Sequence, residues 1–116
     1  MIYADPGIIV ATTGSGTINV DSNAAITAVT DGIKTSAEDG LTEIDVLAAI
    51  EAGDDGISAR AYGGDINIYT SAAATIDAGD NGIDIDFTGD GNVDILVKGE
   101  IDADDDGIHA DVNDGN

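Results

Sequence analysis

The sequence predicts an all-β protein, a parallel β-helix with three short strands in each coil, and three observations support this prediction. An eleven-residue pattern occurs in four copies along the 116 residues, most regularly from Thr75 to Ile85. Gly-Ile pairs recur about every 25 residues. Between these pairs, apolar residues alternate with polar ones, which is the period of a strand that buries one face. Repeats of this size stack on their neighbours and so bury a continuous core.

Five glycines set the period of the repeat. Each is followed by isoleucine, and successive glycines are 25, 24, 26 and 25 residues apart, which gives about four and a half coils. Residues 1–116 are therefore interpreted as a single β-solenoid domain, and the general preference of parallel connections predicts a right-handed winding. The expected turn glycines are Gly7, Gly32, Gly56, Gly82 and Gly107.

Each coil divides into three segments in which apolar residues alternate. The first segment follows the glycine, the second begins about eleven residues later, and the third leads to the next glycine. One face of each segment should point into the core and the other outward. The inward residues that we align across coils are Ile8, Ile33, Ile57, Ile83 and Ile108 in the first segment, Ile18, Ile44, Ile66 and Val93 in the second, and Ile26, Ile50, Ile76 and Ile101 in the third.

The corner between the third segment and the next first segment has a constant length. In every copy the third-segment isoleucine precedes the turn glycine by six residues, whereas the other two connections vary in length. A constant length indicates a constant geometry. We therefore expect the glycine of this fixed corner to adopt a positive φ, with Asp or Asn before it as the turn former.

The charge of the chain excludes some partners. The net charge is −21, and Lys34, Lys98 and Arg60 are the only lysine and arginine residues. Nucleic acids and anionic membrane surfaces attract basic proteins, so neither is expected as a partner. No apolar stretch is long enough for a transmembrane helix, so we expect no membrane insertion.

Acidic residues gather at the corners and on the outer faces of the predicted stack. Carboxylates stacked about 4.8 Å apart repel each other by roughly 1 kcal/mol per pair in water. Ca²⁺, which takes about six to eight oxygen ligands, would relieve this repulsion, and the alternative is a solvated acidic face screened by salt. The candidate corner ligands are Asp54, Asp55, Asp80, Asp104, Asp105 and Asp106, and the expected outward columns are Thr27, Glu51, Asp77 and Asp102 in the third segments and Asn19, Asp45, Asn67 and Asp94 in the second segments.

A second candidate calcium site begins at Asp86, in a stretch that resembles an EF-hand loop. Asp86, Asp90 and Asp94 match the first, fifth and ninth positions of such a loop, and Gly91 matches its turn. Val97 stands at the twelfth position, where the loop needs a carboxylate, and strands rather than helices are expected on both sides. The other interpretation is an ordinary Gly-Asp-Gly turn between two strands.

We expect no enzyme activity from these residues. Catalysis needs several groups in one constellation, but the only histidine, His109, lies on the outward side of the last first segment. Arg60 is expected to act as a counter-ion for nearby carboxylates.

Both ends of the stack are expected to be open, because neither carries an amphipathic helix or a polar cap. Unpaired strand edges at an uncapped solenoid end associate with other strands. The chain is thus expected either to continue into further coils or to meet other subunits end to end. The residues expected at these contacts are Ile2, Tyr3 and Ile8 in the first coil and Ile108 and Val112 in the last.

The repeats resemble those in the β-helical passenger domains of bacterial autotransporters and in giant repetitive adhesins, as the stretch from Lys98 to Ala110 illustrates. The resemblance implies an extracellular or bacterial-surface location and a non-enzymatic stalk or adhesive fibre segment. Its partners would be further repeats of the same chain, or a surface receptor or glycan. Two other functions remain open: a self-assembling filament subunit that stacks end to end, and a small calcium-binding module.

Overall fold

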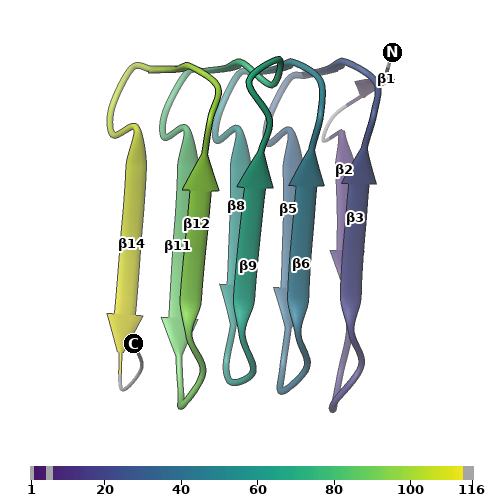
Figure 1. Ribbon diagram of the computed structural model, residues 1–116, viewed down its shortest axis with the longest axis vertical. Helices are drawn as coiled ribbons and strands as arrows, with labels where there is room; N and C mark the ends of the chain where they lie inside the picture. The colour runs from purple at the N-terminus through teal and green to yellow at the C-terminus, as the bar shows by residue number, and fades with distance from the viewer. Residues whose placement is uncertain (1, 5–6, 114–116) are drawn as a thin grey trace.

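The computed structural model describes residues 2–4 and 7–113, and they form a parallel β-solenoid with three strands in each coil (Figure 1). The predicted fold class is confirmed, while the winding sense stays a prediction. Within the described ranges there is no helix of the length and hydropathy needed to cross a membrane. The strands are β1 (Ile2–Ala4), β2 (Ile8–Ala11), β3 (Ile18–Ser22), β4 (Ile26–Ala28), β5 (Ile33–Ala37), β6 (Thr42–Val46), β7 (Ile50–Ala52), β8 (Ile57–Ala61), β9 (Ile66–Thr70), β10 (Ile76–Ala78), β11 (Ile83–Thr88), β12 (Val93–Val97), β13 (Ile101–Ala103) and β14 (Ile108–Asn113).

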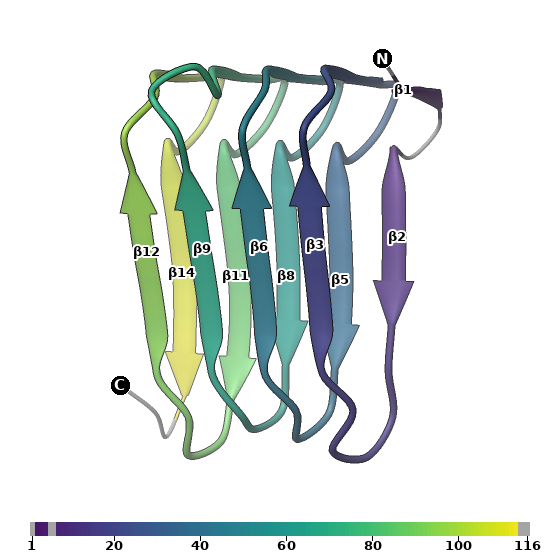
Figure 2. The same cartoon turned by 45° about the vertical axis from the view of Figure 1, so that its right-hand side comes forward.

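The three segments of each coil stack into three sheets. The first sheet has the order β2-β5-β8-β11-β14, the second β3-β6-β9-β12, and the third β1-β4-β7-β10-β13. The longer strands of the first and second sheets lie on facing sides of the coil and run in opposite directions (Figure 1). The three-residue strands of the third sheet close one end of each coil (Figure 2). The cross-section therefore has two long sides and one short side.

The core is a thin layer of isoleucine, valine and alanine between these sheets. Buried and more exposed residues alternate along every strand from β3 to β11, which confirms the predicted inward faces. Each buried isoleucine contributes about 2–3 kcal/mol to stability by leaving water. Phe87 is a fully buried aromatic residue, and its ring stacks in the column of Ala61 and Val112, where the small alanine leaves room for it.

The register of the second sheet differs from the prediction in one coil. We aligned Ile44 with Ile18, but β6 begins with Thr42, and Thr42 pairs with both Ile18 and Ile66. A shift of two residues keeps the same face inward, so the alternation of apolar residues cannot detect it. Thr42 is completely buried, and its hydroxyl has no hydrogen-bond partner among the described residues. A polar residue, Thr42, thus occupies a core position that was not assigned from the apolar residues of the sequence.

The same shift corrects the outward columns of the second sheet. Glu43, rather than Asp45, stacks on Asn67, and Asp45 stacks on Tyr69. The outward column predicted for the third sheet is confirmed, and it consists of Thr27, Glu51, Asp77 and Asp102.

The turn glycines have a different role from the one predicted, because none of the five adopts a positive φ. Positive φ occurs instead at Gly14, Gly64 and Gly89, in the variable connections between the first and second sheets. At the fixed corner, a Cβ on Gly56 would lie 2.6 Å from the carbonyl oxygen of Gly82 in the next coil. Glycine is needed there because backbones of successive coils touch. This correction concerns Gly7, Gly32, Gly56, Gly82 and Gly107.

Substitution of Gly56 by alanine should lower the free energy of unfolding by about 1–3 kcal/mol, because the added methyl overlaps Gly82 and the Ile76 side chain. Gly107→Ala is the matched control, because a Cβ there has no atom within 4 Å. Its effect should stay within about 0.5 kcal/mol. Urea denaturation measures both values, and equal losses would contradict the steric role of the fixed corner.

Candidate functional site

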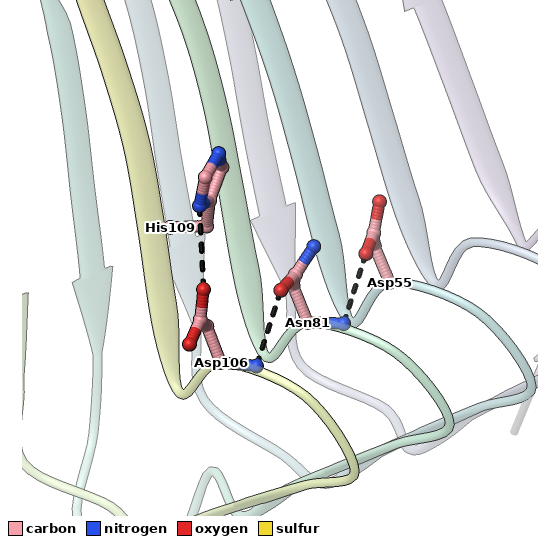
Figure 3. Close-up of polar contacts among 4 residues, drawn as sticks. All are labelled: Asp55, Asn81, Asp106 and His109. Atoms are coloured by element: carbon pink, nitrogen blue, oxygen red, sulfur yellow. Dashed lines mark hydrogen bonds and ion pairs between the residues drawn. The ribbon is translucent and has the colours of Figure 1, made fainter.

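The residues that precede the turn glycines form a hydrogen-bonded ladder from coil to coil. Asp31 Oδ1 accepts a bond from the backbone N–H of Asp55 at 3.2 Å, and Asp55 Oδ1 accepts one from Asn81 at 3.1 Å. Asn81 Oδ1 accepts a bond from the N–H of Asp106 at 3.2 Å (Figure 3). A short side chain with a carbonyl-type oxygen therefore satisfies a backbone donor of the next coil, which is why this position carries Asp or Asn.

Backbone bonds hold the same corner in the other direction. The N–H of Gly32 donates to the carbonyl oxygen of Asp55, and the N–H of Gly56 donates to that of Asn81, each at 3.0 Å. Each ladder residue thus offers its carbonyl to the coil before and its side-chain oxygen to the coil after. Asp31 and Asp55 are only 6% and 9% exposed. The ladder is consequently buried at Asp31 and Asp55, whereas Asn81 is half-buried and Asp106 at the last described corner is exposed.

Burial raises the pKa of the Asp55 carboxyl above its ordinary value of 3.8, and the carboxylates of Asp84, Asp31 and Asp54 raise it further. The hydrogen bond from the Asn81 N–H lowers this pKa, but burial is the larger effect. The pKa of Asp84, on the neighbouring strand β11, is also raised, chiefly by burial. The corner therefore concentrates carboxylates in surroundings that disfavour their ionised form.

Three of the predicted corner ligands gather in one group. One oxygen from each of Asp54, Asp55 and Asp80 lies within 4.8 Å of the others. The ladder orients Asp55, because one of its oxygens is bonded to Asn81. Carboxylate oxygens are ligands of hard divalent cations, and water or backbone carbonyls would have to complete the shell. The group formed by Asp54, Asp55 and Asp80 could therefore hold a metal ion.

The other predicted corner ligands lie in the last described corner, after β13. Asp104 and Asp105 are exposed there. Asp106 Oδ2 lies 3.3 Å from Nδ1 of His109 (Figure 3). Among the described residues, these three carboxylates do not join a group of the kind formed by Asp54, Asp55 and Asp80.

The residues that resemble an EF-hand loop are dispersed. Asp86 lies on the outer face of the first sheet, where its carboxylate is 3.2 Å from the Arg60 guanidinium. Asp90 lies in the turn after β11, and Asp94 lies on the outer face of the second sheet. The outer faces of these two sheets point away from each other, so the side chains do not converge. The ion pair confirms the expected role of Arg60 as a counter-ion.

The residues predicted at the two ends lie in the outermost strands. Ile2 and Tyr3 belong to β1, which pairs with β4, and Ile8 begins β2 and is half-buried. Ile108 is 46% exposed at the start of β14, and Val112 near its end is half-buried. The ends of the stack thus contain apolar residues that the described coils cover only in part.

No protein-family model, no curated protein and no solved structure matches this chain in comparisons with known proteins. The resemblance to autotransporter passenger domains is therefore supported only at the level of the parallel β-solenoid. The fold and the corner define a β-solenoid whose coils are joined by an Asp/Asn ladder.

Substitution of Asp55 by asparagine should raise the Tm at neutral pH when EDTA keeps the solution free of divalent cations. The amide keeps the acceptor that the Asn81 N–H needs, as Asn81 itself does for the next coil, and it removes a buried charge. Asp55→Ala removes the acceptor as well, and should lower the free energy of unfolding by about 1–3 kcal/mol. Thermal melts followed by circular dichroism measure both effects. A lower Tm for Asp55→Asn would contradict the assignment of a destabilising charge.

The pH dependence of the Tm follows from the raised pKa of Asp55. The folded state holds this proton more tightly than the unfolded state, so the contribution of Asp55 to stability is fully present below pH 3.8 and is lost as the pH rises through the folded pKa. The Tm of the native chain should therefore rise when the pH is lowered from about 7 to about 4.5. The rise should be smaller in Asp55→Asn, and an equal rise would assign the dependence to other carboxyls.

Proposed function

We propose that this chain is a non-enzymatic structural β-solenoid, a stalk or adhesive fibre segment that works outside the cell. Successive coils keep the same register at the fixed corner, so the cross-section repeats along the stack. The single histidine is engaged with Asp106, and Arg60 is engaged with Asp86. A net charge of −21 keeps neighbouring copies apart and solvated. These features suit a protein that acts through its length and surface.

The repeated geometry of the glycine corner carries this proposal. A Cβ on Gly82 would meet the backbone of Gly107, whereas a Cβ on Gly107 has no atom within 4 Å. Ile108 is 46% exposed, although its counterpart Ile83 is completely buried. A further coil would therefore fit on this surface, cover Ile108 and pair the free strand edges. The last described coil has the same kind of glycine corner and isoleucine that each earlier coil packs against its neighbour.

Insertion of further coils tests whether the repeat is a modular spacer. Two extra copies of residues 56–81, placed after Asn81, keep an Asn-Gly pair at each new corner. The stack should lengthen by about 10 Å, and the Tm should stay the same or rise. Small-angle X-ray scattering and thermal melts measure these outcomes. An unfolded product would contradict a modular spacer.

An antibody against this chain tests the proposed location. Intact cells of the source organism should be labelled without permeabilisation if the solenoid is displayed on the surface. Labelling that requires permeabilised cells would contradict an extracellular stalk. A stalk also needs anchoring, so the label should sediment with the cells and not remain in the medium.

End-to-end stacking of separate copies is the alternative to further coils within one chain. Both arrangements would place strands of the same repeat on the exposed outermost strands and pair their free edges. Electron microscopy of the purified chain decides, because filaments would favour stacked copies and single particles would favour coils within one chain.

We also propose that Ca²⁺ stabilises the fixed corner by binding between Asp54, Asp55 and Asp80. At a Ca²⁺ concentration of about 100 times the dissociation constant, the bound ion adds roughly 2.7 kcal/mol to stability. The Tm should therefore rise with CaCl₂ and fall with EDTA at constant ionic strength. Asp80→Asn should abolish the rise, and Asp77→Asn, with the same charge change on the third sheet, should keep it. A Tm that Na⁺ raises equally would leave charge screening as the explanation.

A further inference from the structure

The outer face of the second sheet has a shallow hollow that the sequence patterns did not indicate. Its volume is about 230 Å³, and it extends over β6, β9 and β12. Its apolar lining residues are Ile68, Tyr69 and Leu96, and Leu96 is 53% exposed. Its polar lining residues are Glu43, Asp45, Asn67 and Asp94.

The corrected register brings these side chains together. Glu43, Asn67 and Asp94 form one outward column, and Asp45, Tyr69 and Leu96 form the next. Neighbouring strands are about 4.8 Å apart, so an aromatic ring and an aliphatic side chain lie side by side with carboxylates around them. With the register expected from the sequence, Asp45 would have stacked on Asn67, away from the tyrosine.

The chain itself shows that the aromatic ring attracts a cation. The Lys98 ammonium lies over the ring of Tyr69, 5.6 Å from its centroid. The three carboxylates of the hollow take part in no ion pair within residues 2–4 and 7–113, where the cationic groups of Lys34, Arg60 and His109 pair with other aspartates. The hollow therefore combines an apolar surface with three carboxylates that form no ion pair among the described residues, and Lys98 is the cation that lies beside them.

We propose that this hollow binds an arginine side chain from a basic segment of a partner protein. The planar guanidinium stacks on Tyr69 and forms paired hydrogen bonds to Asp45 or Glu43, and the aliphatic stem packs on Leu96. Arginine fits better than lysine because its planar donors match a carboxylate while its face covers the ring. This inference rests on the proposed adhesive function, for which it names the chemistry of the partner.

The test uses a short acetylated peptide with two arginines between glycines, titrated into the full chain by calorimetry at about 0.15 M salt, where distant charges are screened. Tyr69→Ala and Asp45→Asn should each weaken binding by about 5-fold or more. Two matched controls lie outside the hollow. Asp77→Asn removes one charge from the third sheet, and Tyr62→Ala removes a tyrosine that is 56% exposed. Each control should change the affinity by less than about 2-fold.

Any of the following three outcomes would overturn the proposal. Equal weakening by Asp77→Asn and Asp45→Asn would show that the field of the whole chain attracts the peptide. Unchanged affinity of Tyr69→Ala for the peptide would show that the aromatic ring does not contribute to binding. Binding of a neutral oligosaccharide with the same dependence on Tyr69, and no binding of the peptide, would assign the hollow to a glycan. The melting temperature of each variant shows whether it is folded. The coil-insertion experiment tests the stalk separately, so its failure would count against the stalk and leave the result of the peptide titration unchanged.

Discussion

The fold depends on contact between backbones of successive coils at the corner between the third and first sheets. At this corner the carbonyl oxygen of one glycine comes so close to the next that no Cβ fits between them, as Gly56 and Gly82 show. Hydrogen bonds between successive coils set the coil spacing, and glycine lets the backbone of the corner follow this spacing, so the isoleucine columns beside the corner stay aligned. The variable connections elsewhere adapt to this spacing, and there the glycines with positive φ are found.

The acidic residues of the corner are explained by their hydrogen bonds between coils, without any bound ligand. An Asp or Asn oxygen is needed to accept the N–H of the next coil, and Asn81 fulfils this need without a charge. Aspartates at the other positions of the ladder bring like charges together, and burial raises the pKa of Asp55. The repulsion between these stacked carboxylates is offset where a cation lies nearby, as Lys34 does beside Asp31 at 3.4 Å.

The two long faces of the solenoid differ in their charge balance. The outer face of the first sheet carries Lys34, Arg60 and His109, each paired with an aspartate. The outer face of the second sheet carries carboxylates around Tyr69 and Leu96, which have no such partner among the described residues. The solenoid thus has one long face whose cationic groups are each paired with an aspartate, and one long face whose carboxylates around Tyr69 form no ion pair among the described residues.

The sequence by itself determined the solenoid, its period and the inward faces, because a two-residue alternation and a constant six-residue corner leave little choice of fold. The tertiary structure alone decided the rest. Alternation is insensitive to a shift by two residues, so the pairing of Thr42 and the hollow beside Tyr69 depended on the length of a variable connection. The role of the turn glycines, the gathering of three carboxylates at one corner and the dispersal of the loop that resembles an EF-hand likewise follow from distances between coils, which no spacing within a single coil contains.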